Sequence, residues 1–240
     1  MNTVLDYFES TQTNLWLNLT VFTIGYMIYL FSDRTRLVSA VAKKIGPSST
    51  SQEWTVYIQK FIGFLFLGLV PFIITLFAKN GAQESGLTLP AGKHVLLWSF
   101  IPIFLFLLVA VIRPTKNISI DFYPQVRQKE WTKKRVLLNS LFWILYLIGY
   151  EYCFRGFIFF PLVPVFGLLP AIAVNSSVYA LAHIYKGPGE AFGAFFLGIL
   201  LCVIAYATGS FIVPAIVHII MAIGNDMAAV KRNPKMKFSK

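Results

Sequence analysis

The chain has 240 residues, of which 57% are hydrophobic and 13% are charged, and its formal net charge is +11 at pH 7. This composition excludes a soluble domain, whose surface needs more polar side chains. The basic residues are divided among separate segments, so they do not form the single basic patch of a nucleic-acid-binding domain. We therefore expect a polytopic membrane protein that binds the lipid bilayer and no nucleic acid.

Seven apolar stretches are long enough to cross the roughly 30 Å hydrocarbon layer as helices. The first is expected to remain as a span, because the residues before it are polar and do not form a signal peptide. We predict an all-α transmembrane bundle forming one domain over residues 1–240, with three supporting helices in residues 1–130. The predicted spans are 15–31, 58–78, 95–112, 136–160, 163–185, 191–208 and 210–226.

The distribution of Lys and Arg predicts the orientation of this bundle, because cytoplasmic loops are enriched in these residues. With the amino terminus outside, 18 of the 21 Lys and Arg residues fall in segments on the inner side; the exceptions are Lys79, Lys93 and Arg155. The sequence therefore predicts an outer amino terminus and a cytoplasmic carboxyl terminus. The inner basic residues are also expected to attract anionic lipid head groups.

Glu151 is the only acidic residue that the predicted spans place well inside an apolar stretch, and Arg155 is the only basic one. An ionised side chain in a membrane is costly and usually faces a cavity with a function. The two residues are four apart, so they share a helix face and can pair. The pair either holds two helices together or, if Glu151 also meets a histidine, is suited to activating water.

Two histidines follow on later stretches, His183 on the fifth and His218 on the seventh. A lone membrane histidine is typical of packing, but two histidines together with Glu151 favour a catalytic site. Asn225 lies two turns after His218 on the same face, where it can orient a histidine, donate to an oxyanion or end the helix. The predicted limits place His183 about 13 Å nearer the inner face than Glu151, so either the limits are wrong or a water-filled cavity draws the site inward.

Other polar residues in the apolar stretches are interpreted as structural. N-x-S/T triplets begin at Asn18, Asn117 and Asn175, and they fall in spans or in an inner loop, so we interpret them as chance occurrences. Cys153 and Cys202 lie in spans, where thiols behave as small hydrophobes, so they indicate neither a disulfide nor a nucleophile.

Three short motifs resemble those of the CPBP intramembrane proteases, the family of CAAX-processing, bacteriocin-processing and abortive-infection proteins. Residues 150–156 (YEYCFRG) are similar to the EExxFRG motif, except that Tyr150 stands in place of its first Glu. Residues 179–183 (YALAH) are similar to FxxxH, with Tyr in place of Phe. Residues 214–218 (PAIVH) are similar to the approach to HxxxN, but Ala222 occupies the Asn position.

This resemblance covers residues 136–226 and implies a catalytic half made of the last four helices. It implies an intramembrane endopeptidase that hydrolyses a membrane-associated protein or lipidated peptide in a bacterial cell membrane. In the family mechanism, a Glu and the first His activate water, while the second His and an Asn stabilise the oxyanion. Carried over, the catalytic residues are Glu151, His183, His218 and Asn225, supported by Arg155, Tyr179 and Tyr150.

The missing first Glu leaves alternatives open. Either Glu151 takes the role of base, with Arg155 setting its pKa and position, or the chain is a catalytically inactive scaffold or immunity protein. A small transporter in which a Glu-His pair relays protons is a further alternative. We expect no cofactor, because Arg155 repels a cation beside Glu151; zinc bound by Glu151, His183 and His218 is the alternative.

Overall fold

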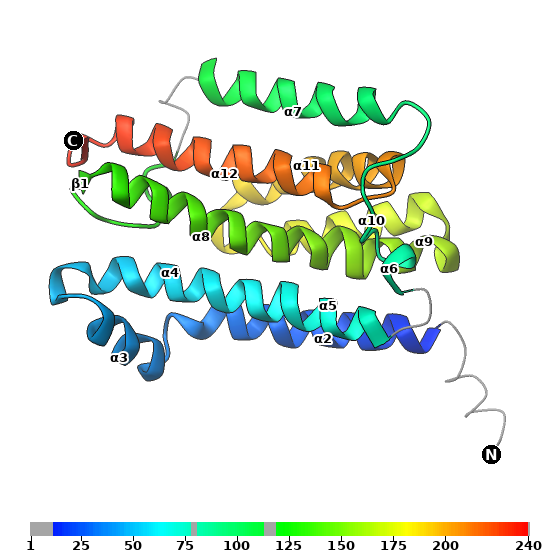
Figure 1. The fold of residues 1–240 in the computed structure, drawn as a ribbon, viewed down its shortest axis with the longest axis horizontal. Coiled ribbons are helices and arrows are strands. Elements are labelled where there is room, and N and C mark those ends of the chain that lie inside the picture. The colour runs from blue at the N-terminus through cyan, green and yellow to red at the C-terminus, as the bar shows by residue number, and fades with distance from the viewer. Residues whose placement is uncertain (1–11, 78–80, 113–118, 240) are drawn as a thin grey trace.

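The computed structural model describes residues 12–77, 81–112 and 119–239, and most of them form one bundle of long helices (Figure 1). Two residues named above lie outside the described residues: Asn117, which begins an N-x-S/T triplet, and Lys79, which was assigned to the outer side of the membrane. The helices are α2 (Gln12–Ser32), α3 (Arg36–Ile45), α4 (Ser51–Gly63), α5 (Val70–Phe77), α6 (Gly81–Glu84), α7 (Val95–Ile112), α8 (Lys133–Glu151), α9 (Phe160–Phe166), α10 (Leu168–Leu181), α11 (Pro188–Thr208) and α12 (Ile212–Arg232). Two π-helical segments, η2 (Phe64–Leu69) and η4 (Tyr152–Phe159), and two 3₁₀ turns, η1 (Ser48–Thr50) and η5 (Ile184–Lys186), connect them, and strands β1 (Glu130–Trp131) and β2 (Lys237–Phe238) pair in parallel.

Six helical stretches in the described part of the chain are long and apolar enough to cross a membrane, which confirms the predicted polytopic helical bundle. They are Leu15–Arg34, Ser48–Phe77, Val95–Ile112, Lys133–Phe166, Pro188–Thr208 and Ile212–Arg232. The inside and outside faces of the bundle remain predictions from the Lys and Arg distribution.

The fifth predicted span is shorter than expected. Instead of covering residues 163–185, the helix α10 has 14 residues, a length of about 21 Å. The residues before it belong to α9, and Gly167 separates the two helices with a φ of 83°, a conformation that glycine adopts without strain. Hydropathy alone did not reveal this break, because the residues on both sides of Gly167 are apolar.

A second buried polar cluster lies near the ends of predicted spans, outside the span interiors in which the sequence placed only Glu151 and Arg155. Asp226 has no exposed surface, and its Oδ2 accepts hydrogen bonds from Nδ2 of Asn139 at 2.9 Å and Nε1 of Trp143 at 2.6 Å. Lys60 is also buried, and its Nζ lies 4.1 Å from the centroid of the Trp143 ring. Lys60 and Asp226 lie at the ends of the predicted spans 58–78 and 210–226. In the structure, α4 begins at Ser51 and α12 continues to Arg232, so both charged residues lie inside helices.

A close contact between glycines holds α8 against η2. A Cβ added to Gly68 would lie 2.8 Å from Cα of Gly149, so neither position has room for a side chain. Small residues allow membrane helices to approach closely and pack by dispersion. Because Gly149 directly precedes Tyr150 and Glu151, this contact fixes the end of α8 that carries the candidate site.

Candidate active site

Glu151 is the last residue of α8 and contacts both a cation and a histidine. Its Oε2 lies 3.0 Å from Nη1 of Arg155, and its Oε1 accepts a 2.6 Å hydrogen bond from Nδ1 of His218 on α12. Neither the Glu151 nor the Arg155 side chain has any exposed surface. The ion pair predicted from the four-residue spacing is therefore present, and the same carboxylate also orients a histidine.

The π-helical segment η4, which carries Arg155, is held by two amides from neighbouring helices. Nδ2 of Asn175 donates to the carbonyl of Phe154 at 2.7 Å, and Nδ2 of Asn18 donates to the carbonyl of Phe157 at 2.7 Å. A π-helix re-spaces its hydrogen bonds, and every buried carbonyl in a membrane needs a donor. The two amides thus stabilise the backbone of the site, a role that the interpretation of their N-x-S/T triplets as chance occurrences did not include.

His183 follows the end of α10, and its ring is fixed by the backbone. Nδ1 of His183 donates to the carbonyl of Tyr179 at 2.8 Å, because a carbonyl can only accept. Burial and, to a smaller extent, the nearby charge of Lys186 together lower the pKa of His183 to about 3. The imidazole is therefore neutral at pH 7 and keeps the lone pair of Nε2 available.

Tyr150 and Tyr179 lie beside both histidines. The centroid of the Tyr150 ring is 6.4 Å from that of His183 and 5.8 Å from that of His218. The corresponding distances from Tyr179 are 4.6 Å and 6.0 Å. The limits predicted for the fifth span, 163–185, are wrong, because α10 ends at Leu181; His183 lies beside Tyr150, the neighbour of Glu151 in the sequence.

These rings border a cavity of about 470 Å³, which is within the usual size range of ligand pockets. His183, His218 and Asn225 line it, together with Tyr150 and Tyr179. Eight further aromatic residues belong to its wall, namely Tyr26, Tyr29, Phe106, Tyr123, Trp143, Tyr146, Tyr185 and Phe196. Glu151 is fully buried behind His218, whose Nδ1 faces the carboxylate, so the Nε2 edge of that imidazole faces the cavity.

A polar group at the edge of the cavity joins segments that are far apart in the sequence. The hydroxyl of Tyr123 donates to Oε2 of Glu190 at 3.3 Å, and Nζ of Lys186 donates to the Tyr123 oxygen at 3.4 Å. Burial lowers the pKa of Lys186, an effect that the Glu190 carboxylate opposes, whereas burial and Glu190 both raise the pKa of Tyr123. No motif in the sequence linked these residues, because only the fold brings them together.

The side chains proposed as zinc ligands are already engaged in other contacts. Both oxygens of Glu151 face Arg155 and His218, so this carboxylate is not available to a metal ion, although a histidine whose Nδ1 donates to an oxygen could still bind one through Nε2. No group of three or more His, Cys, Asp or Glu in the described residues is arranged to hold a metal ion. The residues therefore do not fit the zinc site considered from the sequence.

Comparison with known protein families agrees with the motifs. The model of the family described as Type II CAAX prenyl endopeptidase Rce1-like matches residues 132–224. Residues 132–224 are therefore similar to the Rce1-like family. The match confirms the CPBP resemblance, and it contains Glu151, His183 and His218, whereas Asn225 follows its last residue. Searches among curated proteins and solved structures find no match.

Proposed function

We propose that this multi-pass membrane protein is an intramembrane endopeptidase of the Rce1-like family. The observation that carries the proposal is the 2.6 Å bond between the buried Glu151 carboxylate and Nδ1 of His218, whose other edge faces the cavity. A carboxylate in this position fixes the tautomer of the ring and raises the basicity of Nε2. His218 is thus suited to act as the general base.

The second histidine is suited to position the attacking water. Nε2 of His183 is an acceptor, because Nδ1 carries the proton that is donated to the Tyr179 carbonyl. In the proposal, a single water molecule donates one hydrogen bond to Nε2 of His183 and a second hydrogen bond to Nε2 of His218. The oxygen of this water then points a lone pair at the carbonyl carbon of a bound peptide.

The proposed reaction moves one proton through His218. The water oxygen bonds to the peptide carbonyl carbon while Nε2 of His218 takes the proton, and Glu151 stabilises the imidazolium. The tetrahedral intermediate collapses when the carbon–nitrogen bond breaks, and the same imidazolium gives its proton to the leaving amine. The first products are a carboxylic acid and an amine, the acid passes its proton to the amine to give carboxylate and ammonium, and the histidine returns to its neutral form.

In this proposal, Tyr150 and Asn225 donate hydrogen bonds to the oxyanion. The Tyr150 ring lies beside both histidines, and the Asn225 side chain lines the same cavity. A neutral phenol and an amide each donate hydrogen bonds, and one preorganised donor contributes about 10²–10³ in kcat. Compared with the roles carried over from the family motifs, this proposal gives the base to His218 and places Glu151 behind it.

The substrate in this proposal is a membrane-associated protein or lipidated peptide, cleaved at the cell membrane of a bacterium. The family assignment supports a peptidase, and the aromatic wall of the cavity supports an apolar substrate segment.

Cleavage of membrane-anchored peptide reporters in proteoliposomes tests the assignment. His218→Ala and His183→Ala are expected to abolish cleavage, whereas His94→Ala, which removes an exposed histidine from a loop, is expected to leave it unchanged. Full activity of either cavity variant would defeat the proposal.

A non-catalytic member of the family is the second candidate function. Tyr150, and not a carboxylate, faces the cavity where the resembled motif begins with Glu, and Glu151 has no exposed surface. This candidate predicts that His218→Ala leaves the biological effect intact as long as the protein inserts. The endopeptidase proposal predicts that the effect is lost at unchanged protein level.

A further inference from the structure

The short helix α3 has an apolar face that the bundle covers only in part. Val38 and Ala42 are buried, in keeping with the packing of α3 on α4. Leu37, Val41 and Ile45 are one helical turn apart and form a second apolar stripe, and they are 74%, 38% and 51% exposed. At 100° per residue the two sets lie side by side on one half of the helix, so the apolar face continues beyond the protein contact.

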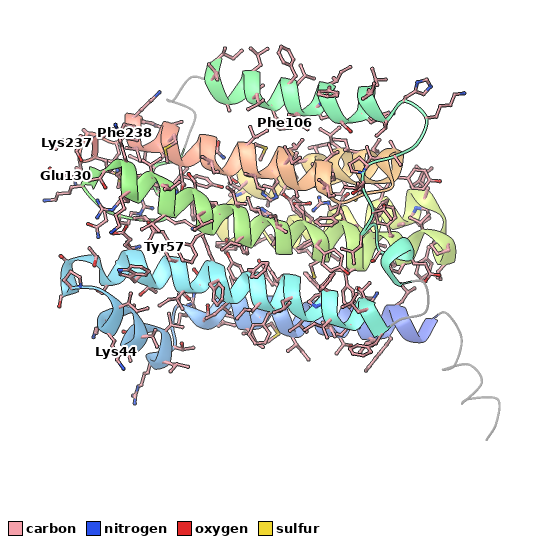
Figure 2. All side chains as sticks on the ribbon, in the orientation of Figure 1. Lys44, Tyr57, Phe106, Glu130, Lys237 and Phe238 are labelled. Atoms are coloured by element: carbon pink, nitrogen blue, oxygen red, sulfur yellow. The ribbon has the colours of Figure 1, made fainter. Side chains whose placement is uncertain are left out.

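The opposite half of α3 carries positive charge. Arg36, Lys43 and Lys44 are exposed and lie on this half, and Arg34 is exposed just before the helix. None of them forms a salt bridge with another described residue. Figure 2 shows Lys44 on the side of α3 that faces away from the long helices.

The position of α3 brings this charged face to one end of the bundle. The helix connects the end of α2 with η1 and α4, and it lies at the same end of the bundle as β1 and the end of α12 (Figure 1). Thr35 accepts a hydrogen bond from the Val38 amide and caps the start of the helix. The helix is therefore a defined element between the first candidate span, which ends at Arg34, and the second, which begins at Ser48.

We propose that α3 is an in-plane membrane anchor that binds anionic lipid, with Leu37, Val41 and Ile45 among the upper acyl carbons and Lys43 and Lys44 at the head groups. An amphipathic helix with a cationic polar face binds such surfaces by combining apolar burial with charge attraction. Each basic residue near an anionic surface contributes roughly fivefold to the affinity at low ionic strength. Charge complementarity thus selects an anionic lipid surface as the partner of the exposed stripe.

Fluorescence quenching in vesicles tests this proposal on the full chain. Leu37→Cys and Ala40→Cys place a fluorescent label on the apolar stripe and on the charged half of the same helix, and the native Cys153 and Cys202 are buried. The quencher is a lipid brominated on its upper acyl carbons. Strong quenching is expected at position 37 and weak quenching at position 40.

The lipid specificity is tested by charge and by vesicle composition. Quenching at position 37 is expected to increase when phosphatidylcholine vesicles are replaced by an equimolar mixture with phosphatidylglycerol. The double substitution Lys43→Gln and Lys44→Gln, which preserves helix propensity, is expected to reduce that increase strongly, because it removes two of the four exposed cations. Equal quenching at positions 37 and 40, or an unchanged increase in the double variant, would overturn the proposal. Quenching at position 37 that declines as the protein-to-lipid ratio rises would show that a second copy covers the stripe, and it would overturn the proposal as well.

Discussion

Glu151→Gln is the substitution that separates the two contacts of the buried carboxylate. Without its charge, Arg155 remains fully buried with no anion at the 3.0 Å distance seen in the structure. Removal of one partner from a buried ion pair costs about 3–5 kcal/mol of stability. The substitution also removes the carboxylate that orients His218, and a change of this kind lowers kcat by about 10²–10⁴.

The two effects are measured separately. Unfolding of the purified protein in mixed micelles reports stability, and cleavage in proteoliposomes, normalised to folded protein, reports activity. The double variant Glu151→Gln with Arg155→Gln is expected to regain much of the stability but none of the activity, because the buried charge is gone and His218 remains unoriented.

The exposed ion pair between Glu130 and Lys237, 3.3 Å apart, provides the control. Glu130→Gln is expected to cost less than about 1 kcal/mol. The reasoning is refuted if Glu151→Gln retains wild-type activity per folded molecule, or if the double variant is as unstable as the single variant.

Three further predictions follow from the geometry of the site. Tyr150→Phe keeps the ring packing and removes one oxyanion donor, so kcat is expected to fall by about 10²–10³ while the melting temperature in detergent stays the same; an unchanged kcat would exclude that role. The unfolded chain protonates His183 near its ordinary pKa of 6.5, whereas the folded chain does so only at about 3, so stability falls as the pH is lowered through this range. At pH 5 the loss is about 2 kcal/mol, and thermal inactivation of His183→Asn should depend less steeply on acid than that of the wild type. Gly68→Ala places a Cβ against the Gly149 backbone and is expected to cost about 1–3 kcal/mol, whereas Gly193→Ala, which meets open space, should cost nothing in the same unfolding assay.

The sequence was sufficient for the helical class and for the convergence of its polar motifs. Long apolar stretches have few stable conformations in a membrane other than helices, and the four-residue spacing of Glu151 and Arg155 required them to share a helix face. The motif order then indicated that His183 and His218 belong to the same site. These inferences depend on local spacing and composition.

Features that depend on packing could not be predicted in this way. Hydropathy did not reveal the π-helical turns of η4, because they are held by Asn18 and Asn175 from other helices. It also gave no sign that Glu151 lies behind His218, since depth in a bundle depends on how the helices are rotated. Burial of Asp226 was missed because a charge near the end of an apolar stretch normally indicates the end of the span.

The central claim is that His218, oriented by Glu151, breaks peptide bonds in the cavity. The most direct measurement is a quantitative comparison of protein carboxyl termini in membranes that contain wild type, His218→Gln or His94→Gln. The account predicts a set of new termini that is shared by wild type and His94→Gln and is absent with His218→Gln. Identical termini in all three membranes would contradict it.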